Sequence, residues 1–224
     1  MNLLILIPTL NEVKNVSILT KKILFAVNYA EILFVDDNSN DGTREEILKL
    51  AKNNKKIKFI FRDSKLGIGS AHKAGITWAK KKKYKKLITM DSDGTHNPIY
   101  LPKMIKRGRS FQIVNTNRFG KRNSLKDWSF IRKLVTTTRH FLIKNLLNLK
   151  FDSSGGYRFY NLEKINLSHI LEAKHNGYSF LWESLYLLKK NKYTISEIDV
   201  LLPSRTLGRS KMRVKDVLDG FAYL

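Results

Sequence analysis

The chain has 224 residues, enough to bury a full core, and its apolar content of 42% is ordinary for a globular protein. Its 42 Lys and Arg against 19 Asp and Glu give a net charge of +23, which favours polyanionic partners such as nucleic acid, anionic lipid headgroups or phosphorylated substrates. The absence of cysteine excludes a disulfide scaffold and a thiolate zinc site, and fits a reducing compartment.

The N-terminal apolar run stops at Pro8 and has no basic leader, so we expect a strand there and not a signal peptide. No apolar run approaches the roughly 20 residues that a membrane-spanning helix needs. We therefore expect a protein that is soluble or lies on a surface.

The first ninety residues alternate between two periodicities. Continuous apolar runs predict strands at residues 3–7, 31–35, 57–61 and 87–90. Helical spacing predicts helices at 11–28, 43–53 and 67–83. Such alternation indicates an α/β protein with a mostly parallel, Rossmann-like central sheet and helices on both faces. No linker divides the chain, so we expect a single domain over residues 1–224.

A polar cluster follows each predicted strand. The first three clusters are PTLNE at 8–12, DDNSNDGT at 36–43 and RDSKLGIGSA at 62–71. Parallel strands bring their carboxyl ends to one edge, so these clusters should meet there. Asp36 and Asp37 suit hydrogen bonds from a ribose or base, although both could simply cap a helix. The turn at Gly67 suits a diphosphate at a helix N-terminus, or only close packing there.

The fourth cluster, DSDGTHNP at 91–98, contains the most informative pair. In a strand, residues i and i+2 share a face, so Asp91 and Asp93 can point at one place. Two close carboxylates repel unless a cation intervenes, and Mg²⁺ or Mn²⁺ with phosphate oxygens would complete such a site. The alternative is that both acids cap the following turn. His96 lies where a metal ligand could be, but we expect a hydrogen-bonded turn histidine.

Together, and in this order, the four clusters resemble those of family 2 inverting glycosyltransferases with the GT-A fold. The similarity is greatest to the dolichyl-phosphate and polyprenyl-phosphate mannose synthases, and the segments SGGYR at 154–158 and RTLGRSK at 205–211 extend it towards the C-terminus. Two positions depart from that group. Thr95 stands where its members usually carry Gln, and Leu10 where an aromatic residue is common, so the donor sugar stays open.

The resemblance implies transfer of a mannose-like hexose from a GDP- or UDP-linked sugar to a polyprenyl phosphate. Residues 1–120 would form the nucleotide-sugar half and residues 121–224 the acceptor half. Asp91 and Asp93 would hold Mg²⁺ or Mn²⁺, with Asp93 and Arg118 acting in catalysis. Arg205, Ser210 and Lys211 would bind the acceptor phosphate. The donor would contact Pro8, Thr9, Asn11, Glu12, Asp36, Asp37, Lys65, Gly67, Asp91, Ser92, Asp93 and Arg118.

Other activities remain open at this point. Transfer to a hydroxyl of a glycan or glycolipid would need a general base, and Glu183 is the best candidate, unless it only pairs with a lysine on its helix. An acid pair with a metal would also serve a nucleotidyltransferase. A non-catalytic nucleic-acid-binding protein is a third class, but the basic runs lack interleaved aromatic residues, and we expect no nucleic-acid partner.

The second half contains two amphipathic segments. Residues 125–149 place apolar side chains on one helical face with basic residues among them, and residues 214–224 form a shorter candidate. A basic amphipathic helix indicates a membrane interface, the alternative being a core helix with a solvated basic face. We expect a cytoplasmic protein lying peripherally on an anionic membrane face, with a membrane-protein partner possible.

Overall fold

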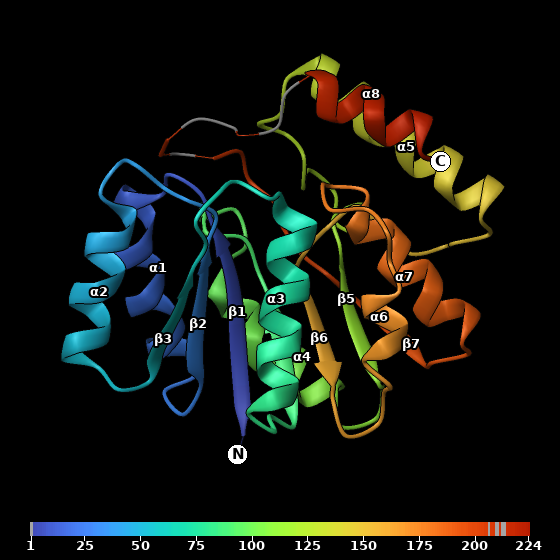
Figure 1. The fold of residues 1–224 in the computed structure, drawn as a ribbon. Helices are drawn as coiled ribbons and strands as arrows, with labels where there is room; N and C mark the ends of the chain where they lie inside the picture. Colours follow the sequence, from blue (N-terminus) through green and yellow to red (C-terminus); the bar gives the residue numbers. More distant parts are fainter. Residues whose placement is uncertain (1, 206, 209–210, 212–213) are drawn as a thin grey trace.

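A computed structural model describes residues 2–205, 207–208, 211 and 214–224. Within these residues the chain forms one seven-stranded sheet in the order β3-β2-β1-β4-β6-β5-β7 (Figure 1). The strands are β1 (Leu3–Thr9), β2 (Glu31–Asp36), β3 (Ile57–Phe61), β4 (Lys86–Thr89), β5 (Ile113–Asn117), β6 (Arg158–Asn161) and β7 (Ile195–Asp199). All neighbours pair in parallel except β6, which runs antiparallel to both β4 and β5. The expected mostly parallel α/β fold is confirmed.

Helices cover both faces of the sheet. They are α1 (Val13–Ala26), α2 (Thr43–Asn53), α3 (Ile68–Lys81), the 3₁₀ turn η1 (Pro98–Tyr100), α4 (Leu101–Arg107), α5 (Phe130–Leu146), α6 (Ser168–Leu171), α7 (Phe180–Lys190) and α8 (Val214–Ala222). The two-residue period of β1 divides the core: Leu3 and Ile5 pack with α1, α2 and α4, whereas Leu4 and Leu6 pack with α3, α6 and α7.

Strand β4 ends one residue earlier than the sequence predicts. Met90 still donates its N–H to the Leu6 carbonyl at 3.0 Å, but the N–H of Asp91 turns to His96 Nδ1 instead of continuing the ladder. Asp91 and Asp93 therefore lie in the turn that follows the strand, and not on one face of the strand itself.

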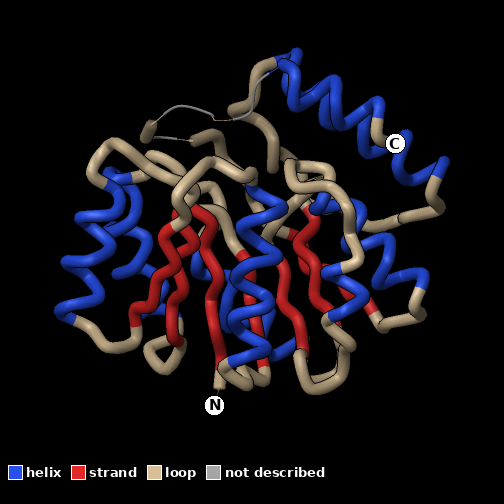
Figure 2. The backbone as a smooth tube through the Cα atoms, viewed as in Figure 1, coloured by secondary structure: helices blue, strands red, loops and turns tan. Residues whose placement is uncertain are grey.

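The helix expected at 125–149 is shorter at both ends. It begins at Phe130, where the Ser129 hydroxyl accepts the N–H of Arg132 at 3.3 Å, and ends at Leu146. Trp128 precedes it as a buried anchor whose indole N–H donates to the Leu202 carbonyl at 3.1 Å. Helices α5 and α8 lie at the end of the molecule beyond the carboxyl ends of the parallel strands (Figures 1 and 2). No helix in the described part of the chain is long and apolar enough to cross a membrane.

Candidate active site

A cavity of about 750 Å³ opens where the carboxyl ends of β1, β2 and β4 meet, beneath α5 and α8. Its walls contain most of the side chains that the sequence singles out, namely Pro8, Thr9, Glu12, Asp37, Lys65, Gly67, Asp91, Ser92, Asp93, Arg118, Arg205 and Lys211. Asn11, Asp36 and Glu183 lie outside the lining, and Ser210 lies outside the described residues. The strand ends thus converge as expected.

The two metal-candidate acids sit in different environments. Asp93 Oδ1 accepts the N–H of Thr95 at 3.0 Å and its hydroxyl at 2.7 Å. Burial acts to raise the pKa of Asp93, but the Thr95 hydrogen bonds and the charges of His96 and Arg205 outweigh it, so the pKa lies below its ordinary value. Burial raises the pKa of Asp91, and the nearby charge of Asp93 raises it further, while the charge of His96 opposes this shift.

Asp91 and Asp93 suit a hard divalent cation that takes its other ligands from a phosphate. Asp91 Oδ1 is buried and has no hydrogen-bond partner among the described residues. No third His, Cys, Asp or Glu in the described chain joins the pair to form a closed metal cage. Carboxylate oxygens suit Mg²⁺ or Mn²⁺, which readily take their remaining ligands from water and a diphosphate. The residues present therefore fit such an ion.

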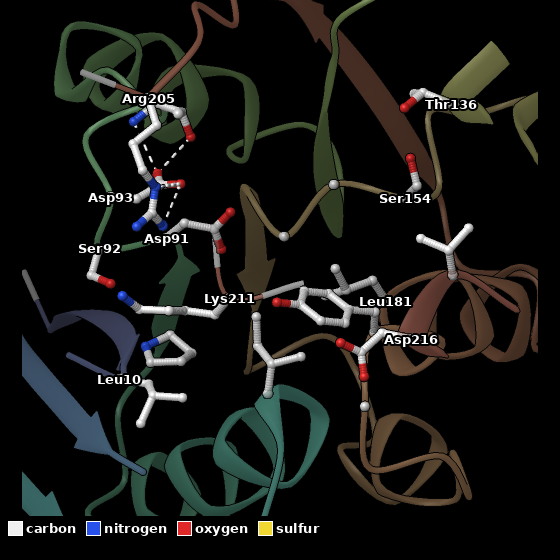
Figure 3. Close-up of a pocket in the computed structure, with 18 of the residues that line it drawn as sticks. Leu10, Asp91, Ser92, Asp93, Thr136, Ser154, Leu181, Arg205, Lys211 and Asp216 are labelled. Carbon is white, nitrogen blue, oxygen red and sulfur yellow. Dashed lines mark hydrogen bonds and ion pairs between the residues drawn. The ribbon is translucent and has the colours of Figure 1, made fainter. Parts of the chain in front are cut away.

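Arg205 spans the acids on this side of the cavity (Figure 3). Its guanidinium lies 3.0 Å from Asp93 Oδ2 and 2.9 Å from Glu12 Oε1. Burial raises the pKa of Glu12, while Asn15 and Arg205 oppose that shift. A residue expected to bind the acceptor phosphate thus pairs with a metal-candidate acid.

The other acid pair mainly builds the loops. Asp37 accepts the N–H of Leu66 at 2.8 Å and that of Gly67 at 2.9 Å, and pairs with Arg62. Gly67 has a φ of +94°, and a Cβ there would lie 2.5 Å from the Asn176 carbonyl oxygen, so glycine is required. Asp37 thus lies in the cavity wall and holds the turn at Gly67 through these hydrogen bonds.

Two residues expected at the donor lie outside the cavity lining and hydrogen-bond within the loops. Asp36 is fully buried and accepts hydrogen bonds from Thr9, Ser39 and Arg44. Asn11 joins the first two loops, because its N–H donates to Ser39 Oγ at 2.8 Å and its side-chain oxygen accepts the N–H of Asn40 at 3.0 Å.

The cavity is also lined by an arginine group that sequence reasoning missed in part. Arg118 is held by Asp152, with its Nε 2.7 Å from Oδ2. Arg132, Thr136 and Arg139 of α5 line the same cavity. Burial, and then the charge of Arg118, lower the pKa of Arg139 to about 10. Its Nε has no hydrogen-bond partner among the described residues. The i, i+4, i+7 spacing of 132, 136 and 139 was the available signal.

Glu183 lies behind the site on α7. Its carboxylate accepts the N–H groups of Lys174 and His175 at 2.8 and 3.0 Å, and the Tyr223 hydroxyl at 3.0 Å. This carboxylate secures the 174–175 loop and the C-terminal helix.

The remaining wall is apolar. It is formed by Ile68, Trp128, Ile131, Val135, Leu181, Leu202, Val214 and Val217. In Figure 3, Arg205, Asp93 and Ser92 lie on one side of the cavity and Thr136 and Ser154 on the other. The cavity thus combines acids, clustered cations and an apolar surface.

Two curated proteins are similar to this chain over most of its length. The chain is 31% identical to the polyprenol monophosphomannose synthase of Mycolicibacterium smegmatis, over 93% of this chain and 80% of that protein. It is 28% identical to the undecaprenyl-phosphate mannosyltransferase of Micrococcus luteus, over 95% of this chain and 88% of that protein.

Among solved structures, glucosyl-3-phosphoglycerate synthase from Mycobacterium tuberculosis, crystallised with Mn²⁺, UDP and its glucosyl product, superposes with a TM-score of 0.67. It shares 16% identity and covers 99% of this chain and 77% of that one, which shows the GT-A fold. The family model for glycosyl transferase family 2 matches residues 4–166. This chain therefore belongs to glycosyl transferase family 2.

Proposed function

We propose that this glycosyltransferase moves a hexose, in the first instance mannose, from a nucleoside diphosphate sugar to a polyprenyl phosphate with inversion at the anomeric carbon. The observation that carries the proposal is one cavity lined by an acid pair, an arginine group and an apolar surface. The metal-bound diphosphate would need the acid pair, the acceptor phosphate would need the arginines, and the polyprenyl chain would need the apolar surface. Family membership leaves no reason to invoke a non-catalytic nucleic-acid-binding protein.

On the donor side, Asp91 and Asp93 would hold Mg²⁺ or Mn²⁺ against the diphosphate. The M. tuberculosis neighbour, crystallised with Mn²⁺ and UDP, supports a divalent ion in this fold. Such an ion neutralises the charge that develops on the departing diphosphate. Pro8, Thr9, Lys65, Gly67 and Ser92 line the same side, where a nucleoside diphosphate would lie.

On the acceptor side we place Arg132 and Arg139, together with Arg118, which the resemblance assigns to the donor and to catalysis. These arginines would bind the phosphate, since guanidinium groups grip two phosphate oxygens together. Arg205 and Lys211 would complete its binding. Arg205 cannot hold Asp93 and a phosphate with the same N–H groups, so we infer that neutralising Asp93 with a cation frees Arg205 for the acceptor.

The reaction needs no general base. A phosphate monoester has its second pKa near 6, so an ionised oxygen is available at neutral pH. That oxygen forms the new bond to the anomeric carbon as the bond to the diphosphate breaks, and the leaving nucleoside diphosphate takes the electron pair. Glu183, the candidate base for a hydroxyl acceptor, lies outside the cavity lining and accepts three hydrogen bonds.

Helix α5 supports action at a membrane surface, because its polar face points inward and an apolar face points outward. Phe130, Leu134 and Phe141 are 78%, 54% and 63% exposed. At 3.6 residues per turn they fall within about 40° of one another, roughly opposite the inward residues Arg132 and Arg139. An apolar stripe facing outward is costly in water but suits the interfacial region of a bilayer.

Basic residues lie beside this apolar stripe and would favour a leaflet that contains anionic lipid. Lys133 and Lys144 lie within about 60° of the stripe on α5, and Val214 and Leu218 extend the exposed apolar surface on α8. Basic residues near a membrane surface contribute about 1 kcal/mol each to binding anionic lipid. We propose peripheral association with a cytoplasmic leaflet, where the acceptor lipid could enter between α5 and α8.

The test is transfer of labelled sugar. Purified protein is incubated with GDP-mannose, or with UDP-linked hexoses, plus Mn²⁺ and polyprenyl phosphate in vesicles. Label should move into the organic phase and be released by mild acid. Asp93→Asn should abolish transfer with the fold intact, whereas Arg109→Gln, an exposed arginine outside the cavity, should not. Label that stays in the aqueous phase with every donor would contradict the proposal.

A further inference from the structure

Asp152 holds Arg118 from behind the cavity wall. Its Oδ2 accepts the Nε–H of Arg118 at 2.7 Å and the backbone N–H of the same residue at 3.0 Å. The side chain of Asp152 is 1% exposed and is not part of the cavity lining, whereas Arg118 lines the cavity. Asp152 therefore acts on a ligand in the cavity only through Arg118.

This pairing determines which edge of the guanidinium faces the cavity. A planar guanidinium binds two phosphate oxygens through two N–H groups on one edge. Because Asp152 occupies Nε, the edge that remains is the one formed by Nη1 and Nη2. Neither Nη of Arg118 has a hydrogen-bond partner among the described residues. The ion pair thus leaves a complete phosphate-binding edge for the cavity.

The backbone of Asp152 is in turn anchored to the sheet. Glu197 of β7 accepts its N–H at 2.8 Å, and the side-chain amide of Asn115 on β5 donates to its carbonyl at 2.9 Å. The same amide nitrogen donates to Glu197 at 2.8 Å. Arg118 directly follows β5, so the sheet carries both members of the ion pair.

The chain after Asp152 leaves room for the Nη edge. A Cβ added to Gly155 would lie 2.7 Å from Arg118 Nη2, closer than a Cβ approaches another heavy atom. Apart from the chain neighbours of Gly155, only Arg118 has atoms within 4 Å of that position. Gly155 is not among the glycines with positive φ, so alanine could adopt its backbone conformation. A side chain at this position would therefore displace Arg118 and strain nothing else.

We propose that Asp152 and Gly155 are the positioning residues of Arg118, Asp152 by holding Nε and Gly155 by leaving space for Nη2, so that both Nη groups are directed at the acceptor phosphate. The inference rests on the proposed function, because it assumes that Arg118 binds that phosphate. A binding group misplaced by about 1 Å can cost about 100-fold in rate, so small displacements of this guanidinium should be measurable.

Gly155→Ala is the first test. Acceptor binding is measured by titration with a short-chain polyprenyl phosphate, and the acceptor and donor KM by transfer of label. We expect acceptor affinity to fall about 10-fold or more and the acceptor KM to rise accordingly. The donor KM should be unchanged, and the thermal midpoint should stay within about 2 °C because only the end of a side chain has to move.

Gly156→Ala is the matched comparison. The three atoms nearest to a Cβ at Gly156 belong to Asp91, Leu181 and His72, at 3.3, 3.5 and 3.7 Å, and none belongs to Arg118. Acceptor affinity should therefore stay near that of wild type. An equal loss in both glycine variants would assign the effect to the loop as a whole and would overturn the inference.

Two substitutions at Asp152 separate position from charge. In Asp152→Asn the amide oxygen can still accept both N–H groups of Arg118, whereas Asp152→Ala removes the acceptor. We expect near-wild-type acceptor affinity in Asp152→Asn and a loss of about 10-fold or more in Asp152→Ala. Equal losses in the two variants would show that Asp152 acts through its charge, against the inference. If Asp152→Ala does not fold, Gly155→Ala decides alone.

Arg118→Lys shows whether the effects pass through Arg118. Lysine keeps a charge beside Asp152 but has no Nη edge, so acceptor affinity should fall, and adding Gly155→Ala should weaken it no further. Additive losses would overturn the inference, as would a Gly155→Ala variant that raises the donor KM in place of the acceptor KM. The proposed role of Arg118 fails by a different result, namely wild-type acceptor affinity in Arg118→Lys itself.

Discussion

At the scale of single residues, Glu183 is a carboxylate that lies outside the cavity lining and is engaged by hydrogen bonds within the fold. Three donors converge on it from Lys174, His175 and Tyr223. Glu183→Gln removes one acceptor oxygen and turns an NH₂ towards these donors. We expect a loss of about 1–3 kcal/mol in unfolding free energy, measured by urea denaturation, with kcat per folded molecule nearly unchanged.

Tyr223→Phe is the matched control, because it deletes only the hydroxyl bond and should cost about 1 kcal/mol. A fall in kcat of several orders of magnitude at unchanged stability would restore Glu183 as a base and favour a hydroxyl acceptor.

Arg139 makes the opposite case, a charge buried without a partner for its Nε among the described residues. A phosphate would supply that partner, and hydrogen bonds to charged groups contribute about 1.5–3 kcal/mol. Arg139→Met should therefore raise the acceptor KM about 10- to 100-fold and leave the donor KM and the stability nearly unchanged. Arg109→Met controls for the lost charge. An unchanged acceptor KM would remove Arg139 from the acceptor site.

His72 predicts a dependence of stability on pH. It is 1% exposed, and burial, followed by the charges of Arg158 and His96, lowers its pKa to about 3. Between the pKa of this residue in the unfolded chain, near 6.5, and its pKa in the folded protein, only the unfolded chain binds the proton. Stability therefore falls as pH falls, by up to about 1.4 kcal/mol per pH unit.

The raised pKa values of Glu12 and Asp91 make stability rise as pH falls. The effect of His72 must therefore be isolated by comparing wild type with a variant that lacks this histidine. Urea denaturation of wild type and His72→Met at about pH 7.5 and about pH 5 should show that wild type loses more stability on acidification. Equal losses in both proteins would contradict the assignment.

At the scale of elements, α5 shows which properties of a helix its sequence predicts and which depend on where the helix packs. The amphipathic pattern at 125–149 was visible, and the interpretation as a core helix with a solvated basic face is wrong for Ile131, Leu134 and Leu146, which are exposed. Periodicity defines two faces but does not say which one meets the rest of the protein. Here the arginine face lines the cavity, and only the tertiary structure shows it.

The outward stripe gives a direct prediction. Replacing Phe130, Leu134 and Phe141 together by Ser should greatly reduce cosedimentation with anionic vesicles, while thermal stability should change little because exposed side chains contribute little to it. Phe25→Ser is the matched control, since Phe25 is 93% exposed in the last turn of α1, where the chain has returned from the carboxyl end of β1 towards the start of β2. Equal vesicle binding by wild type and the triple variant would exclude α5 as the membrane contact.

At the scale of the whole molecule, the N-terminal half was the predictable part. Helix α2 and strand β3 have the predicted bounds, because their periodicity is regular and turn residues flank them. Strands β5, β6 and β7 were not predicted, since polar residues interrupt their apolar runs (IVNTN, RFYN and ISEID) and β6 reverses direction. The acids that line the cavity come from local motifs and were predicted. The two arginines of α5, Arg132 and Arg139, line it because of how a distant helix packs, and neither was predicted as a site residue.

The central claim is that the cavity joins a donor diphosphate on the acid side to an acceptor phosphate on the arginine side. Phosphorus NMR of polyprenyl phosphate in vesicles, during turnover with the nucleotide sugar and a divalent ion, tests it most directly. The account predicts that the monoester signal is replaced by that of a phosphodiester as nucleoside diphosphate appears. Consumption of the sugar donor with an unchanged monoester signal would contradict it.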